Sequence, residues 1–339
     1  MTPRVAVIVP CYNLGRYLDE AIDSVLAQSF QDVEIVVVDD GSSDSDTRAR
    51  LDAFDRPRTR VIRSANRGLP AAKNLGLAET SAPYVCMFDA DDRLLPDMLA
   101  KSVAALDDDA RLAFVSHWVR HFGDESFDWA PTDCGFPALL DVNTVNGAAL
   151  VRRSALDAVG GFDETMRDGC EDWDVWIALV ERGFRGRILE EVLYEYRRRP
   201  ESMSRLMVRG DGHPRLYRRI VEKHATTFAG HVGPLMLRRE RDLAALRRHA
   251  HDLGLEYDSR LAPALASRRD DVAVLEKKAA RLAQETAEEE ARARERAALH
   301  DEIAKARREI DDIRRSASWT ITAPLRAIYD MLGLARARR

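Results

Sequence analysis

The sequence YVCMFDADD, residues 84–92, decides the fold. Its first five residues, 84–88, are apolar or aromatic without alternation, which is typical of a strand buried on both faces in a parallel sheet. The acidic run DADD, residues 89–92, follows at once. In open α/β sheets, ligands bind just beyond the carboxyl ends of the strands. The stretch therefore predicts a buried strand that ends at a ligand-binding edge.

Three similar apolar runs precede this strand, at 5–10, 33–40 and 60–65, and each is followed by a polar cluster. Helical spacing of apolar residues lies between them at 16–28 and 70–79. Strands that are apolar on both faces and alternate with helices predict an α/β fold, with a Rossmann-like, mostly parallel sheet flanked by helices. Because parallel strands end at one edge, the polar clusters should converge on a single crevice.

The chain after residue 110 is more mixed. We expect strands at 112–118 and 187–196, a strand-like segment near 145–151 and a helix at about 171–182. From about residue 214 the chain becomes helical and basic. The second half of the sequence therefore predicts an extension of the sheet followed by a helical region of different character.

Two further segments follow at the C-terminal end. Residues 268–315 are rich in Ala, Glu and Arg, with apolar residues three and four apart. They predict a long helix that can self-associate as a weak coiled coil, or else a solvated single helix. Residues 316–339 combine Trp, Ile, Leu and Met with four arginines. This composition fits an amphipathic helix on a membrane surface, or a helix that docks on this protein or on a partner.

Charge is distributed unevenly along the chain. Residues 1–110 hold 19 acidic against 12 basic residues, whereas residues 197–248 hold 14 basic against 5 acidic ones. The acidic first part argues against nucleic acid as the main partner. The basic part would serve a membrane surface, a ligand carrying pyrophosphate, or solubility alone.

The remaining composition excludes several classes of protein. The four cysteines are scattered without paired short spacing, which argues against a zinc ribbon or a disulfide framework. No run of 18 apolar residues occurs, and the N-terminal sequence enters a strand without a signal-peptide pattern. We therefore expect a cytoplasmic protein whose contact with a membrane, if it has one, is peripheral.

The acidic residues predict the chemistry. Asp89 and Asp91 stand at i and i+2 after a buried strand, where they can share a hard divalent cation such as Mn²⁺ or Mg²⁺. A solvated acidic turn is the alternative. Asp39 and Asp40 end the run 33–40, where they could accept hydrogen bonds from a nucleobase or ribose, or could instead cap a helix at 44–54.

Other polar positions add to this set. Tyr12 could stack on a base or be a structural tyrosine, and Lys73 could face a phosphate or be an ordinary surface lysine. Glu171 and Asp172 open a predicted helix, whose dipole stabilises a carboxylate and should lower its pKa. A catalytic base nevertheless needs only correct placement against a hydroxyl that loses its proton.

The motifs together resemble a known family. They are VAVIVPCYN (5–13), VVVDDGSSD (36–44), NRGLPAAKN (66–74), FDADD (88–92), GGFDE (160–164), GCEDWDVW (169–176) and YRRRPESMS (196–204). In this order and spacing they look like the family 2 inverting glycosyltransferases of the glycosyltransferase-A fold, of the type that builds bacterial cell-envelope polysaccharides. The resemblance covers about residues 3–205.

The resemblance implies a role for each matching position. Asp172 would be the catalytic base with Glu171 beside it, and Asp91 would be the principal metal ligand with Asp89 in support. Trp173 would line the acceptor side. A nucleotide-sugar donor would lie against Pro10, Tyr12, Asn13, Asp39, Asp40, Asn66, Gly68, Lys73, Asp89 and Ala90, and a closing loop with Arg197, Arg199 and Ser202 would face the diphosphate or the acceptor.

Two positions depart from the family pattern. Lys73 stands where arginine is more common, which keeps the charge but loses the bidentate fork. Arg199 stands where the closing loop often carries histidine. The part that Arg199 plays at the diphosphate therefore stays open at this point.

The predicted function is the metal-dependent, inverting transfer of a sugar from a nucleoside-diphosphate sugar, expected to be a UDP-sugar, to a hydroxyl of a glycan or lipid-linked acceptor at the inner face of the cell membrane. A catalytically inactive scaffold and a sugar nucleotidyltransferase are the alternatives. The expected parts are a catalytic domain at 1–213, a basic helical region at 214–263, the long helix at 264–315 and the amphipathic helix at 316–339.

Overall fold

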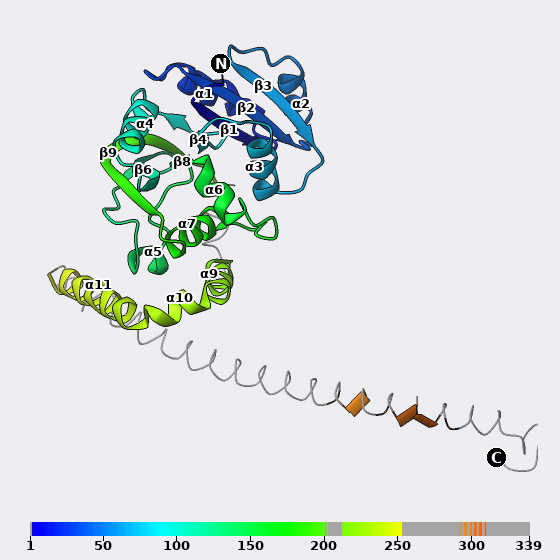
Figure 1. Cartoon of the computed structure of the whole chain (residues 1–339), viewed down its shortest axis with the longest axis vertical. Coiled ribbons are helices and arrows are strands. Elements are labelled where there is room, and N and C mark those ends of the chain that lie inside the picture. Colours follow the sequence, from blue (N-terminus) through cyan, green and yellow to red (C-terminus); the bar gives the residue numbers. More distant parts are fainter. Residues whose placement is uncertain are drawn as a thin grey trace, which may run out of the picture. The chain divides into compact units, whose positions relative to one another are not determined.

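The computed structural model describes residues 2–200, 202, 212–252 and single positions between 292 and 309 (Figure 1). The chain divides into two units, 1–244 and 245–339, and the sheet belongs to the first. The predicted long helix is described only at those single positions, which are helical, with Leu299 and Ile303 exposed. The predicted amphipathic helix at 316–339 lies outside the described residues.

In the described part of the chain, nine strands form one sheet in the order β3-β2-β1-β4-β8-β6-β9-β5, with β7 paired to β6. The pairs β3–β2, β2–β1 and β1–β4 are parallel, as the apolar runs predict. The other half is mixed, because β8 runs antiparallel to both β4 and β6. The strands are β1 (Val5–Cys11), β2 (Val33–Asp40), β3 (Thr59–Ser64), β4 (Tyr84–Met87), β5 (Arg93–Leu94), β6 (Leu112–Gly123), β7 (Phe127–Trp129), β8 (Leu150–Arg152) and β9 (Arg185–Arg198).

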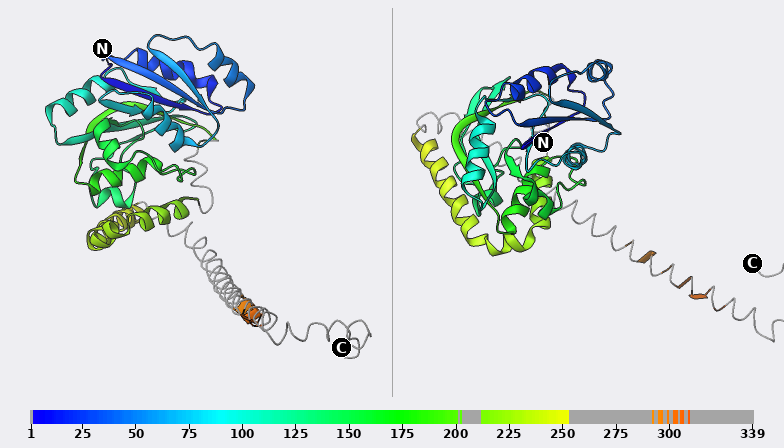
Figure 2. Two further views of the ribbon diagram at one scale, coloured as in Figure 1. Left: turned by 45° about the vertical axis from the view of Figure 1, so that its right-hand side comes forward. Right: turned by 45° about the horizontal axis from the view of Figure 1, so that its top comes forward.

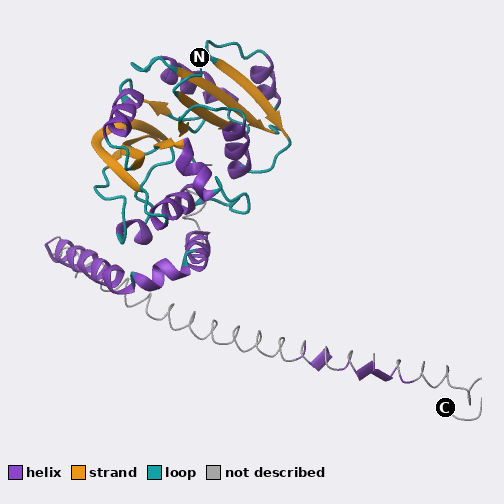
Figure 3. Ribbon diagram, viewed as in Figure 1, coloured by secondary structure: helices purple, strands orange, loops and turns teal. Residues whose placement is uncertain are grey.

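Helices cover both faces of this sheet, as the purple and orange ribbons show (Figure 3). Successive residues of β1 belong to different hydrophobic clusters, with Val7 and Val9 in one and Ile8 in the other. This division explains why the strand sequences are apolar without alternation. The helices are α1 (Gly15–Leu26), α2 (Ser45–Asp52), α3 (Leu69–Ala78), α4 (Met98–Asp108), α5 (Ala138–Asp141), α6 (Arg153–Val159), α7 (Glu171–Glu181), α9 (Gly212–Lys223), α10 (Ala225–Gly230) and α11 (Val232–Asp252).

The structure adds elements that the sequence analysis does not contain. The helix α4 buries Met98, Leu99, Val103 and Leu106, a helical spacing that follows the acidic run by only a few residues. Of the strand-like segment near 145–151, only the last two residues form a strand, as the beginning of β8 (Leu150–Arg152). Figure 2 shows the sheet from two further sides. No helix of the described residues is long and apolar enough to cross a membrane.

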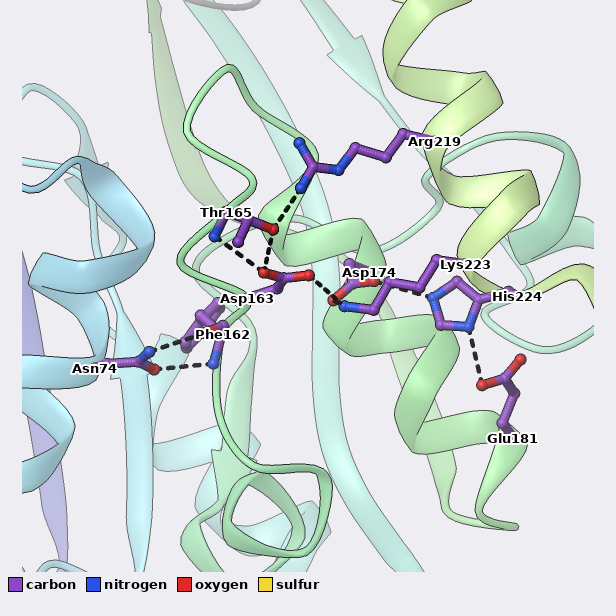
Figure 4. A network of polar contacts seen from close by, with 9 residues as sticks. All are labelled: Asn74, Phe162, Asp163, Thr165, Asp174, Glu181, Arg219, Lys223 and His224. Carbon is purple, nitrogen blue, oxygen red and sulfur yellow. Dashed lines mark hydrogen bonds and ion pairs between the residues drawn. The ribbon is translucent and has the colours of Figure 1, made fainter. Parts of the chain in front are cut away.

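The helices α9 and α10 are anchored to α7 by a cluster of charged side chains (Figure 4). Asp174 on α7 is 3% exposed and contacts His224 Nε2 at 3.0 Å and Lys223 Nζ at 2.8 Å. The other nitrogen of His224 lies 2.9 Å from a Glu181 oxygen, and Lys223 also donates to Asp163 at 2.7 Å. The basic region therefore begins packed against the helix that opens with Glu171 and Asp172.

Candidate active site

A cavity of about 1160 Å³ lies at the carboxyl ends of β1, β2 and β4 and extends to β6, β7 and β9. It gathers residues from segments more than 180 positions apart, as expected for the edge of an α/β sheet. Asp39 and Arg197 are not among the lining residues. The other site residues expected from the sequence do line it: Pro10, Tyr12, Asn13, Asp40, Asn66, Gly68, Lys73, Asp89, Ala90, Asp91, Glu171, Asp172, Trp173, Arg199 and Ser202.

The two aspartates at the end of β2 bind backbone amides of neighbouring loops. Asp39 accepts from Ser42 N at 2.9 Å, and the two oxygens of Asp40 accept from Arg67 N and Gly68 N, both at 2.8 Å. Gly68 has φ of 95°, a conformation that favours glycine. Asp40 thus shapes the loop before α3.

The helix α2 is capped by a different residue from those expected. The side chain of Asp44 accepts from Thr47 N at 2.8 Å, so Asp39 and Asp40 are not its capping residues. Asn13, with φ of 57°, accepts from the backbone N–H groups of Ser43 and Asp44, both at 2.9 Å. The loops after β1 and β2 are therefore tied together, and they hold the ring of Tyr12 45% exposed at the cavity.

The acidic run after β4 separates into three environments. Asp92 is 1% exposed, accepts hydrogen bonds from the Tyr194 hydroxyl and from Arg197 N, and so joins the run to β9. Asp91 lines the cavity and pairs with Arg199, Nε to Oδ2, at 2.7 Å. Burial raises the pKa of Asp89 to about 6, although the positive charge of Lys73 opposes the shift.

Lys73 and Glu171 form a buried ion pair beside these carboxylates. Lys73 Nζ lies 2.6 Å from Glu171 Oε1, and the two residues are 3% and 4% exposed. Burial by itself would lower the pKa of Lys73, but Glu171, Asp89 and Asp172 raise it above its ordinary value. The lysine therefore stays charged and is held at the cavity wall by Glu171.

Asp172, at the start of α7, is held by two hydrogen bonds. Asn143 Nδ2 donates to Oδ2 at 3.1 Å, and Trp173 N donates to Oδ1 at 2.7 Å. Burial, followed by the nearby charge of Glu171, raises the pKa of Asp172 to about 6. The expectation that the pKa is lowered at the helix start is wrong, because the loss of solvation outweighs the charge of Lys73 and the two hydrogen bonds.

The wall of the cavity differs from what the sequence indicates at Trp173 and in a group of aromatic residues. Trp173 is 2% exposed and donates from Nε1 to Leu139 O at 2.7 Å, so it presents little surface to a ligand. A group of aromatic side chains that the sequence analysis does not name lines the cavity instead. Its members are His121, Phe127, Trp129 and Tyr196, with the Phe127 ring 47% exposed and stacked 4.1 Å from the ring of His121.

The signal for this aromatic group is weak in the sequence. Its residues come from β6, from the three-residue strand β7 and from β9, so only the pairing of these strands brings them together. Asn143 is missed for a similar reason, since it lies in a loop 29 residues before the aspartate that it contacts.

The acidic side chains fit a divalent cation only if a bound phosphate group supplies further oxygen atoms. Asp91 and Asp89 offer carboxylate oxygens at the cavity, the donor type that Mn²⁺ and Mg²⁺ prefer. Among the described residues, however, no three His, Cys, Asp or Glu side chains are grouped to hold a metal ion. Magnesium is commonly bound through one or two carboxylates together with phosphate oxygens, and the present residues match that pattern.

Comparisons with known proteins agree with this architecture. A model of glycosyl transferase family 2 matches residues 6–162. EpsE of Bacillus subtilis is 30% identical over 211 residues, which cover 60% of this chain and 76% of EpsE. The glycosyltransferase GlyG of Streptococcus pneumoniae is 38% identical over 102 residues, which cover 29% of this chain and 34% of GlyG. The matched region is thus most of EpsE but about a third of GlyG.

A solved structure shows the same fold. The crystal structure of S. aureus TarS, residues 1–349 in complex with UDP-GlcNAc, superposes with a TM-score of 0.51 at 20% identity, and the match covers 60% of this chain and 61% of that 1–349 chain. The sheet, the motif order and the relationship to EpsE therefore agree, and the chain belongs to glycosyl transferase family 2, with a glycosyltransferase-A fold.

Proposed function

We propose that this transferase moves a sugar from a UDP-sugar to a hydroxyl group of a glycan or lipid-linked acceptor, with inversion at the anomeric carbon. The observation that carries the proposal is the position of Asp172. Its carboxylate is partly exposed on the same cavity as Asp89 and Asp91, with a pKa of about 6. It is thus mostly ionised at neutral pH and can accept a proton.

The donor would lie against the loops after β1, β2 and β4. Tyr12 offers an exposed ring to a base, while Asp39 and Asp40 stand at the end of β2 with part of their hydrogen-bonding capacity used by loop amides. Lys73 places a positive charge at the cavity wall for a diphosphate. The complex of TarS with UDP-GlcNAc supports a uridine diphosphate sugar as the first donor to test.

The reaction would proceed as one displacement. The acceptor hydroxyl gives its proton to Asp172 while its oxygen forms a bond to the anomeric carbon. The bond between that carbon and the diphosphate oxygen breaks, and its electron pair leaves with the nucleoside diphosphate. Asn143 orients the carboxylate by donating to Oδ2 at 3.1 Å. Attack from the face opposite the leaving group inverts the configuration.

A divalent cation would be held by Asp91, with Asp89 in support, once the diphosphate supplies the remaining oxygen ligands. When bound, it would supply positive charge for the leaving diphosphate. Lys73 and Arg199 are two of the described residues that bring positive charge to the same region.

The cellular setting that we propose is the inner face of the cell membrane, in the synthesis of cell-surface polysaccharide. The basic region and the segment 316–339 would bring the transferase to its acceptor by peripheral contact, and the segment 268–315 would allow self-association. The division into a catalytic domain at 1–213 and three C-terminal parts belongs to the same proposal.

The purified 339-residue chain with Mn²⁺ or Mg²⁺ should release nucleoside diphosphate from at least one member of a panel of UDP-sugars. Asp172→Asn and Asp91→Ala should each lower turnover by about 10²–10⁴-fold, because each removes a group used in the transfer step. Asp108→Asn, which changes an exposed carboxylate at the end of α4, is the matched control and should keep the wild-type rate. Wild-type rates in both site variants would refute the mechanism.

A further inference from the structure

The ion pair between Arg199 and Asp91 occupies the position expected for the metal. Arg199 Nε lies 2.7 Å from Asp91 Oδ2, and the two side chains are 16% and 10% exposed. Both residues line the cavity. A pair so little exposed is screened by salt much less than a surface pair, so it holds the aspartate firmly.

This pair competes with a divalent cation for the same carboxylate. The lone pair of Oδ2 that accepts from Arg199 is not available to a metal while the hydrogen bond lasts, and the guanidinium neutralises the charge that would attract the cation. A cation beside the guanidinium would also be repelled, and in a partly buried site like charges a few ångströms apart interact strongly. A second guanidinium is close, since Arg197 Nε donates to the backbone oxygen of Asp91 at 2.7 Å. The protein by itself therefore disfavours a metal at Asp91.

A diphosphate would change this balance. Guanidinium groups bind phosphate oxygens through two parallel hydrogen bonds, a stronger arrangement than a single bond to a carboxylate. Arg199 is the first residue after β9, and its side chain reaches the cavity. It can therefore exchange Asp91 for a phosphate group without breaking the sheet.

The neighbouring cations are less suited to this exchange. Lys73 is 3% exposed and paired with Glu171 at 2.6 Å, so its removal would leave a buried carboxylate alone. Arg197 pairs with Glu20 and Asp91 O and is not among the lining residues. Arg199 alone among these three combines a place on the cavity with a direct bond to the Asp91 carboxylate.

We propose that Arg199 is an exchangeable counter-ion of Asp91. It neutralises Asp91 before the donor arrives, then transfers its guanidinium to the diphosphate and leaves Asp91 to the divalent cation. The inference rests on the proposed function in one respect, since it assigns the cavity to a nucleoside diphosphate. Its consequence is that UDP and metal strengthen each other's binding, and thermodynamic linkage makes this effect equal in both directions.

The test compares wild type with Arg199→Gln by two equilibrium measurements on the full chain. Binding of Mn²⁺ alone is followed by electron paramagnetic resonance of the free ion, and binding of UDP at saturating Mn²⁺ by calorimetry. The variant should bind Mn²⁺ alone about tenfold more tightly, because Asp91 is released, and UDP with Mn²⁺ about tenfold more weakly. If Arg199 had only a structural role, its replacement would weaken both the Mn²⁺ affinity and the UDP affinity. Opposite changes in the two affinities therefore identify the counter-ion role.

Two further variants control for fold and charge. Arg120→Gln removes an arginine that pairs with Asp128 on the neighbouring strand and is not among the cavity-lining residues, so both affinities should stay unchanged. Asp91→Asn should abolish the gain in Mn²⁺ affinity in the Arg199→Gln background. Melting temperatures establish that each variant is folded. If Arg199→Gln is not folded, Arg199→Lys takes its place; it keeps the charge but loses the planar fork, and it should shift the two affinities in the same opposite directions by a smaller factor.

The outcomes separate the two proposals. Unchanged or weaker Mn²⁺ affinity in Arg199→Gln, with UDP binding intact in wild type, overturns the counter-ion role and leaves the transferase function standing. Tighter Mn²⁺ binding with unchanged UDP affinity overturns the transfer of the guanidinium to the diphosphate. Failure of wild type to bind UDP with or without Mn²⁺ contradicts the proposed function itself.

Discussion

Burial sets the charge of the individual residues around the cavity. Asp89 and Asp172 both have a pKa raised to about 6, whereas Lys73 keeps its proton because Glu171 is 2.6 Å away. Groups with shifted pKa values are concentrated at functional sites because chemistry requires charges that the protein interior opposes. The positions of these residues could be predicted from motif order, but the size and sign of the pKa shifts depend on packing that only the structure shows.

The pH dependence of the reaction follows from Asp172. Its pKa is raised to about 6, so the carboxylate is ionised above that pH and protonated below it. We expect kcat/KM for transfer to be level above pH 7 and to fall about tenfold per pH unit below pH 6, because a protonated base cannot accept a proton. Steady-state rates between pH 5 and 8.5 check this.

The residual activity of Asp172→Asn supplies the control for the pH profile. In this variant kcat/KM should no longer fall below pH 6, because the amide of the asparagine does not titrate. A wild-type profile that stays flat down to pH 5, or an identical acid limb in the variant, would show that another group controls the rate.

Among the secondary-structure elements, the sequence predicts best those strands whose own residues are buried. The strands β1, β2 and β3 begin and end within a residue or two of the apolar runs. The residues of β1 and almost all of those of β2 are buried, so their apolar runs mark the strands directly, whereas the edge strand β3 is only partly buried. The strands β5 and β7 have two and three residues and exist through their pairing with β9 and β6, so no local pattern indicates them. The aromatic group on the cavity depends on that pairing and was missed with it.

The anchor between α7 and α10 should make stability depend on pH. Both ring nitrogens of His224 face carboxylates, those of Asp174 and Glu181, and Lys223 lies beside them. Only the protonated imidazole can donate to both. Burial alone would lower the pKa of His224, but these hydrogen bonds outweigh it and raise the pKa above its ordinary value.

A raised histidine pKa contributes stability that is fully present below the unfolded value and is lost as pH rises through the folded one. His224→Gln should therefore lower the melting temperature more at pH 5.5 than at pH 8.5. Thermal unfolding at the two pH values, in one buffer series of constant ionic strength, measures the difference. Equal destabilisation at both would mean that the charge of His224 adds nothing to the anchor.

At the scale of the whole molecule, the fold and the family could be predicted from the sequence because the motifs keep their order over 200 residues. Chain topology then brings Asp172 to the same cavity as Asp91, although 80 positions separate them. The parallel half of the sheet explains the place of Asp91 beyond β4, whereas Asp172 opens α7, between β8 and β9 of the mixed half. The acceptor could not be predicted, because the residues that β6, β7 and β9 contribute to the cavity form no recognisable motif in the sequence.

The central claim is a single displacement at the anomeric carbon with Asp172 as base. Proton NMR of the sugar first released or transferred from α-linked UDP-GlcNAc, or from the panel donor that is used best, tests it most directly. We expect the β configuration, read before mutarotation, and loss of this product in Asp172→Asn. An α product, or a β product formed at the wild-type rate without Asp172, would contradict it.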